Sequence, residues 1–185
     1  ITDFLPYLVE DPVFDREMPS PTAIPDNYFK RFSYSGIFRI RRGNTDISVI
    51  ENEPIFLTYR KGEAVMQAMT LAAAFYASAQ FESRECNFYG EEIILKKYVT
   101  KGYYQPYPKE KRDGDVDWNE TEREKRAVTR EQTLEMVVKI KETKGKVAVD
   151  ASITGQPHVP VSWELSFRKG GELSGVTGDP HVTDA

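Results

Sequence analysis

The chain has 185 residues, of which 29% are charged and 39% hydrophobic, and its formal net charge is −4. This balance is typical of a globular chain, and the length allows one ordinary domain with a core. A negative net charge excludes a general electrostatic attraction to nucleic acid or to an anionic membrane.

The single cysteine, Cys86, excludes an intrachain disulfide framework and any cysteine-based zinc site. No apolar run approaches the roughly 20 residues that a membrane-spanning helix needs, because the longest candidate, residues 64–79, is interrupted by polar side chains. The chain begins at Ile1 with neither an initiator methionine nor a signal-peptide pattern. We therefore expect a processed product or a piece of a longer protein.

Five prolines within residues 1–30 predict an extended lead-in, because proline fixes φ and lacks a backbone donor. Residues 32–58 then predict a β-hairpin followed by a third strand. Alternation places four apolar residues on one face of the first strand: Phe32, Tyr34, Phe38 and Ile40. Arg39 and Arg41 are expected on the opposite face, and Gly43 supplies the tight turn.

Residues 64–79 allow two interpretations. Their alanines, methionines and leucine favour a helix, and the apolar spacing also fits one. As a strand, the same stretch places five residues on one face: Met69, Leu71, Ala73, Phe75 and Ala77. We favour the strand, because no helix cap precedes it and the turn at Lys61 and Gly62 enters it directly from another strand.

The segment from Ile93 to Thr100 predicts a further strand, with Ile93, Leu95 and Val99 on one side. A dense cluster of aromatic residues and prolines follows at 102–108. Residues 109–131 are almost uniformly charged, with both signs mixed. Such a segment has little apolar surface to bury, and we expect a solvated, mobile insertion.

The last third of the chain returns to regular alternation between apolar and polar residues. Three strands are predicted between glycine-containing turns: Leu134 to Ile140, Val147 to Ile153, and Val159 to Phe167. Several short strands with glycine-rich turns indicate an all-β protein with an antiparallel β-sandwich. We expect a lead-in over 1–30, a sandwich over 31–176 that contains the insertion, and a tail over 177–185.

Four segments carry a family resemblance, in the order Ser35–Gly43, Leu71–Phe81, Gly102–Pro106 and Val159–Leu173. They resemble parts of the β-sandwich domain of heparinase II/III-like polysaccharide lyases. The resemblance implies a large antiparallel sandwich that packs beside an α/α toroid, so a helical domain of the same protein, missing from this chain, would be its partner. It also favours a periplasmic or extracellular location.

The resemblance implies a β-elimination of a uronic-acid polysaccharide. In these lyases a Tyr or His acts as the base, and an Asn or His neutralises the carboxylate. Most of these residues belong to the helical domain. The present chain contains only two histidines and no His-x-His or His-Asp pair. We therefore expect the isolated chain to be non-catalytic, without cofactor or metal.

His158 is the one weak catalytic candidate. It follows a predicted turn, and its ordinary pKa near neutrality suits acid–base chemistry. The alternative is an exposed loop histidine, since no partner clusters with it in the sequence. Asp179 and His181 could join it around zinc, which would be a minimal ligand set.

A basic patch for a uronate or a sulfate is one interpretation of five residues: Arg39, Arg41, Arg42, Lys96 and Lys97. The alternative is a solvent-facing surface with cross-strand ion pairs to Asp46 or Glu51.

An aromatic platform for sugar rings is one interpretation of Tyr103, Tyr104, Tyr107 and Trp118. The alternative is a packing plug at the edge of the sandwich. The predicted glycan-binding set therefore consists of Arg39, Arg41, Tyr103, Tyr104 and Tyr107.

Three functions remain open. The chain is a non-catalytic accessory domain that contacts an acidic polysaccharide, or it contributes to a lyase active site completed by the helical domain, or it is a free-standing carbohydrate-binding module. The full-length open reading frame would discriminate between them, because a preceding helical block of about 300 residues favours the lyase.

Overall fold

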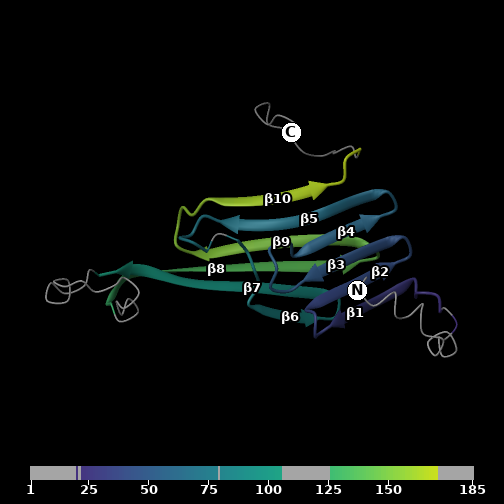
Figure 1. Ribbon diagram of the computed structural model, residues 1–185, viewed down its shortest axis with the longest axis horizontal. Coiled ribbons are helices and arrows are strands. Elements are labelled where there is room, and N and C mark those ends of the chain that lie inside the picture. The colour runs from purple at the N-terminus through teal and green to yellow at the C-terminus, as the bar shows by residue number, and fades with distance from the viewer. Residues whose placement is uncertain (1–19, 21, 79, 106–125, 171–185) are drawn as a thin grey trace, which may run out of the picture.

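The computed structural model describes residues 20, 22–78, 80–105 and 126–170, and these residues form two antiparallel sheets that pack face to face (Figure 1). The large sheet has the order β1-β2-β3-β4-β5-β10. Its strands are β1 (Asn27–Phe32), β2 (Ile37–Arg42), β3 (Thr45–Ile50), β4 (Leu57–Lys61), β5 (Ala64–Ala73) and β10 (Val161–Phe167).

The small sheet has the order β6-β7-β8-β9. Its strands are β6 (Glu85–Tyr89), β7 (Glu92–Tyr104), β8 (Val128–Thr143) and β9 (Lys146–Gly155). The described residues contain no helix, so none of them forms a helix that is long and apolar enough to cross a membrane. The predicted all-β antiparallel sandwich is confirmed.

The core lies between the two sheets and follows the predicted alternation. Phe38 and Ile40 of β2 and Ile47 and Val49 of β3 are buried on the large sheet's inner face. The facing strands β7 and β8 bury the predicted sets: Ile93, Leu95 and Val99, and Leu134, Met136, Val138 and Ile140. Removing this apolar surface from water is the main force that holds the sheets together.

The segment 64–79, which allowed either a helix or a strand, begins with strand β5. Met69, Leu71, Ala73 and Phe75 are buried as the strand interpretation predicts, whereas Ala77 is exposed. The helical propensity of this segment is overridden because the large sheet needs an apolar inner face at this position. The strand ends at Ala73, and the chain then leaves the sheet.

The prediction that Phe32 and Tyr34 share one face with Phe38 and Ile40 is wrong, because Phe32 pairs with Ile37 and Arg31 pairs with Phe38. The chain turns between β1 and β2, where the Ser35 N–H donates to the carbonyl of Phe32 and Gly36 has a φ of +63°. This turn interrupts the alternation, so Tyr34 is fully exposed and Phe32 is 43% exposed. Serine and glycine at the turn are the local cause.

The boundaries of the predicted segments differ from the strands at two places. Residues 27–30 of the predicted lead-in belong to β1, and residues 128–131 of the predicted insertion belong to β8. The greater part of the insertion and of the lead-in, and the whole tail over 177–185, lie outside the described residues. Strand β6 was not predicted, because its exposed side chains do not alternate.

The chain passes between the sheets twice, and both passages lie at the same end of the sandwich (Figure 1). Residues 74–84, which we call the crossover, lead from β5 to β6. Residues 156–160 lead from β9 back to β10, where the Pro160 carbonyl accepts a hydrogen bond from the Ala74 N–H. This end of the molecule therefore brings together segments that are distant in the sequence.

Candidate functional site

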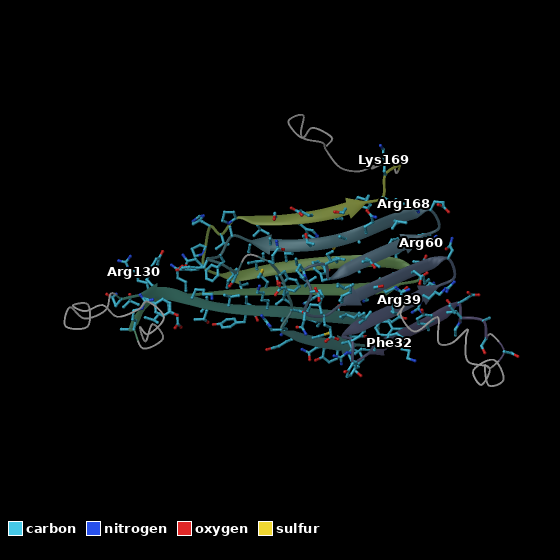
Figure 2. The ribbon with its side chains drawn as sticks, in the orientation of Figure 1. Phe32, Arg39, Arg60, Arg130, Arg168 and Lys169 are labelled. Carbon is cyan, nitrogen blue, oxygen red and sulfur yellow. The ribbon has the colours of Figure 1, made fainter. Side chains whose placement is uncertain are left out.

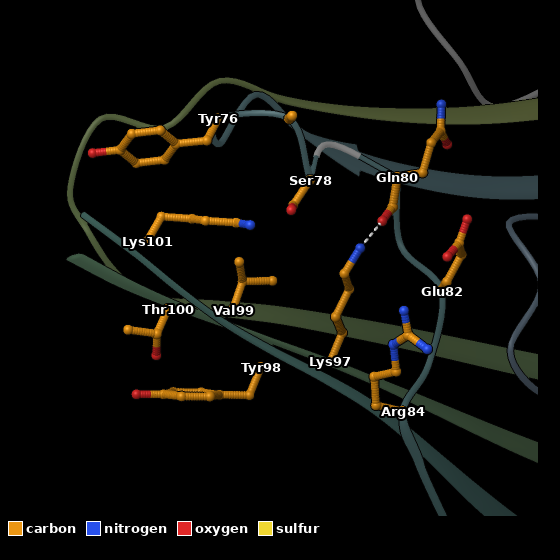
Figure 3. Close-up of a pocket in the computed structure, with 11 residues that line it drawn as sticks. Tyr76, Ser78, Gln80, Glu82, Arg84, Lys97, Tyr98, Val99, Thr100 and Lys101 are labelled. Atoms are coloured by element: carbon orange, nitrogen blue, oxygen red, sulfur yellow. Dashed lines mark hydrogen bonds between the residues drawn. The ribbon is translucent and has the colours of Figure 1, made fainter. Parts of the chain in front are cut away.

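An open groove of about 660 Å³ lies between the crossover and β7 (Figure 3). The crossover contributes Tyr76, Ser78, Gln80, Glu82 and Arg84 to its wall. The last half of β7 contributes the facing wall: Lys97, Tyr98, Val99, Thr100 and Lys101. We call this hollow the crossover groove.

Lys97 occupies an inward-facing position of β7, between the buried side chains of Leu95 and Val99. It is only 8% exposed, and its Nζ donates a hydrogen bond to the Gln80 carbonyl of the crossover (Figure 3). Burial lowers the pKa of Lys97, because a charged amine loses its hydration; Glu82 opposes this shift, and the positive charge of Arg84 adds to it.

Arg84 and Lys101 are exposed at the groove, and neither belongs to an ion pair among the described residues. With Lys97 they give the groove three basic side chains against one acidic side chain, Glu82. A locally positive groove therefore exists on a chain whose formal net charge is −4.

Aromatic rings line the same groove. The Tyr76 ring contacts the rings of Phe75 and Tyr103 at centroid distances of 5.0 and 5.9 Å, and its hydroxyl donates to Gln132 Oε1 at 3.0 Å. Loss of hydration raises the pKa of Tyr76, and the neighbouring Tyr103 raises it further. Tyr76 also has a φ of +51°, a left-handed conformation that costs a non-glycine residue about 1 kcal/mol or more.

The arginines of the predicted glycan-binding set are engaged with carboxylates. Arg39 Nη2 lies 3.1 Å from Asp46 Oδ1, and Arg41 Nη2 lies 3.8 Å from Asp26 Oδ1. The first pair is the cross-strand contact that the alternative interpretation predicted. A smaller hollow of about 230 Å³ lies beside Arg39, between β3, β4 and β5.

The predicted basic patch is divided between two sheets. Arg39 lies on the outward-facing side of β2 in the large sheet, whereas Lys96 alternates with Leu95 and so faces outward from the small sheet. Lys97 faces inward. The five basic residues therefore do not form one surface. The sequence did not reveal this, because it does not indicate which strands belong to the same sheet.

The predicted glycan-binding set is also divided. Tyr103 and Tyr104 pair with Thr129 and Val128 at the far end of β7 and β8. Figure 2 shows Arg130, the next residue of β8, at the opposite end of the molecule from Arg39. Of the described members of the predicted set, only Tyr103 reaches the crossover groove, through its contact with Tyr76. Tyr107 and Trp118 lie outside the described residues.

The candidates for acid–base or metal chemistry do not converge in the described part of the chain. His158 is exposed in the loop between β9 and β10 and has a φ of +60°. No group of three His, Cys, Asp or Glu side chains that could hold a metal ion occurs among the described residues. Asp179 and His181 lie outside them.

Cys86 of β6 is half-buried, near the ion pair between Arg31 and Glu51. Burial, supported by the negative charge of Glu51, raises the pKa of the Cys86 thiol to about 12. The thiolate is the nucleophilic form of cysteine, so this thiol is unreactive at neutral pH.

Sequence reasoning missed Tyr76, Arg84 and Lys101, and it assigned Lys97 to a different surface. One signal was present: in the alternating run of β7, Lys97 replaces an apolar residue at an inward-facing position. Comparison of the chain with protein-family models gives no match, and comparisons with curated proteins and with solved structures give none either.

Proposed function

We propose that the protein is a non-catalytic β-sandwich accessory domain that binds an acidic polysaccharide in the crossover groove. The observation that supports this function is the position of two cations without ion-pair partners in the described structure, Arg84 and Lys101, beside the exposed rings of Tyr76 and Tyr98. Tyrosine rings alone would be enough to bind a neutral saccharide. The added positive charges of Arg84 and Lys101 favour a uronate or a sulfated sugar.

The chemistry of each wall fits a different part of such a ligand. A guanidinium can bind a carboxylate or a sulfate with two parallel hydrogen bonds, and an ammonium adds a compact charge. Tyrosine rings offer apolar faces to the C–H groups of a sugar and a polar edge to its hydroxyls. Because the groove is open to the surface, a long chain can lie along it.

The family resemblance of four segments supports the same class of ligand, uronic-acid polysaccharides, and a helical domain as the partner in a larger protein. The raised pKa of Tyr76 keeps its phenol protonated, which opposes a role as a general base. A contribution to a lyase active site is favoured by one observation, the lowered pKa of the Lys97 amine. The third alternative is a free-standing carbohydrate-binding module.

Replacing Arg84 and Lys101 together by glutamine is expected to weaken binding of heparin or alginate at least tenfold. Each replacement removes a charge-assisted hydrogen bond of about 1.5–3 kcal/mol, and about 1.4 kcal/mol corresponds to a factor of ten. The measurement is isothermal titration calorimetry at low and at physiological salt, with neutral dextran as the uncharged reference.

The matched control is the double change Arg60→Gln and Lys61→Gln, which removes the same charge from the end of β4. Figure 2 shows Arg60 at the other end of the molecule from Arg130. This control is expected to bind nearly as well as the unchanged chain. An equal loss in both double variants would mean that binding follows net charge, and no binding of any acidic glycan would refute the proposed function.

The isolated chain is expected to produce no unsaturated uronate from heparin, heparan sulfate, alginate or chondroitin. β-Elimination requires a base, a group that neutralises the carboxylate and an acid for the leaving oxygen around one sugar. The check is ultraviolet absorbance of the conjugated product, measured also with His158→Ala and Lys97→Met. Product from the unchanged chain would overturn the non-catalytic assignment, and its loss in one variant would identify that residue as essential.

A further inference from the structure

Among the described strands, β10 is the outermost strand of the large sheet and pairs with β5 alone. The small sheet has four strands against six in the large sheet, and its own outermost strand on this side is β9. Figure 1 shows β10 lying beyond β9, so the small sheet does not reach under it. The inner face of β10 consequently has no cover among the described residues.

The strand predicted over Val159 to Phe167 is present as β10, and its apolar face is half-exposed. Val161, Trp163, Leu165 and Phe167 are 38–50% exposed, whereas Leu71 and Ala73, their neighbours on β5, are buried. The cause is the shorter reach of the small sheet. An exposed apolar strand at a sheet edge is a ready template for pairing with another strand.

The backbone of β10 also has an edge that pairs with no other described strand. The Pro160 carbonyl accepts from Ala74, and the Arg168 N–H donates to Val65. Even-numbered residues of β10 therefore direct their backbone groups to β5, and odd-numbered residues direct theirs outward. The outward groups include those of Trp163, Leu165 and Phe167. The only charged residue within β10 is Glu164.

We propose that β10 pairs antiparallel with β10 of a second copy of this chain, in a register centred on Ser166. The large sheets of both copies would then form one continuous sheet across a two-fold axis. In this register Glu164 lies opposite Arg168 of the partner subunit, and the same contact is repeated on the other side of the axis. Figure 2 shows Arg168 and Lys169 at the end of β10, where such a contact can form.

The charges of Glu164 and Arg168 favour this register, and they favour a second copy of the chain as the partner. A pairing centred on Glu164 would place two glutamates opposite each other, and one centred on Leu165 would place Glu164 opposite a serine. Only the Ser166-centred pairing gives opposite charges in both contacts. Neither Glu164 nor Arg168 has an ion pair within the described structure, so the strand is complementary to itself, as a two-fold interface requires.

The test is a charge exchange in the full chain, followed by sedimentation velocity over roughly 1–100 µM. The unchanged chain is expected to form dimers in this range. Glu164→Arg places arginines opposite each other, and Arg168→Glu does the same with glutamates, so each single variant is expected to weaken dimerisation at least tenfold. The double variant restores opposite charges and is expected to dimerise like the unchanged chain.

Both positions are exposed, so the variants are expected to keep the melting temperature of the monomer, which thermal unfolding at low concentration checks. A second variant, Leu165→Pro, removes a backbone donor that points outward and should abolish the dimer. A chain that stays monomeric throughout, or a double variant that fails to recover, would overturn the proposal. Slow hydrogen exchange of the outward-pointing amides of Trp163, Leu165 and Phe167 in a monomer would overturn the proposal as well, because it would indicate that another segment of the same chain pairs with this edge.

Discussion

Replacing Arg42 by methionine is expected to lower the free energy of unfolding by about 3–5 kcal/mol, because it leaves a buried carboxylate without its counter-charge. Arg42 of β2 lies 2.9 Å from Glu142 Oε2 of β8 and 2.9 Å from Glu91 Oε1. The Glu142 side chain is fully buried, and its other oxygen accepts a hydrogen bond from the Gly145 N–H. Urea unfolding at neutral pH measures the effect.

The controls separate the buried charge from the loss of one arginine. Arg39→Met breaks the more exposed ion pair with Asp46 and should cost about 1 kcal/mol or less. Adding Glu142→Gln to Arg42→Met removes the uncompensated charge, so the double variant is expected to be more stable than Arg42→Met alone. Equal losses for Arg42→Met and Arg39→Met would show that the contact between the sheets contributes little.

Replacing Gly155 by alanine is expected to destabilise the protein by about 3–5 kcal/mol, through backbone strain and overlap together. Gly155 ends β9 with a φ of +118°, and a Cβ atom there would lie 2.2 Å from the Thr133 carbonyl oxygen. That oxygen belongs to the backbone of β8 and accepts a hydrogen bond from the Gln156 N–H, so it cannot move freely. Thermal and urea unfolding measure the change.

Gly43→Ala is the matched control. Gly43 also has a positive φ, of +58°, but a Cβ atom there would meet nothing within 4 Å. Its expected cost is the left-handed conformation alone, about 1–2 kcal/mol. If the two alanine variants were equally stable, the close approach of β8 to Gly155 would not be a constraint on this fold.

Most strands of the sandwich could be predicted from the sequence, because one face of each is buried. The alternation in β7 and β8 predicted the buried residues of the small sheet directly. Segment 64–79 was harder, since its composition favours a helix, and only the preceding turn and the missing helix cap indicated a strand. Strands β1 and β6 carry no such alternation, because their side chains are mostly exposed or half-exposed.

The candidate site could be predicted only in part, because one wall is the crossover between the sheets and the other is a strand of the small sheet. Tyr103 was selected as an aromatic residue beside prolines, and Lys97 as a basic residue on a strand. Nothing in the sequence indicates that the crossover folds over the last half of β7, which brings Tyr76 and Arg84 to them. The arginines of β2 were predicted to bind a glycan because they are clustered in the sequence, but they form ion pairs with carboxylates of neighbouring segments.

The order of strands in the large sheet has a consequence for how the chain folds. Nine of the ten described strands pair with a neighbour in sequence, so β1 to β5 and β6 to β9 can each form through local contacts. Strand β10 is different, because Val161 pairs with Ala73, about 90 residues earlier, and closing so long a loop carries a larger entropic cost. During synthesis, the edge of β5 therefore stays open until the whole small sheet has left the ribosome.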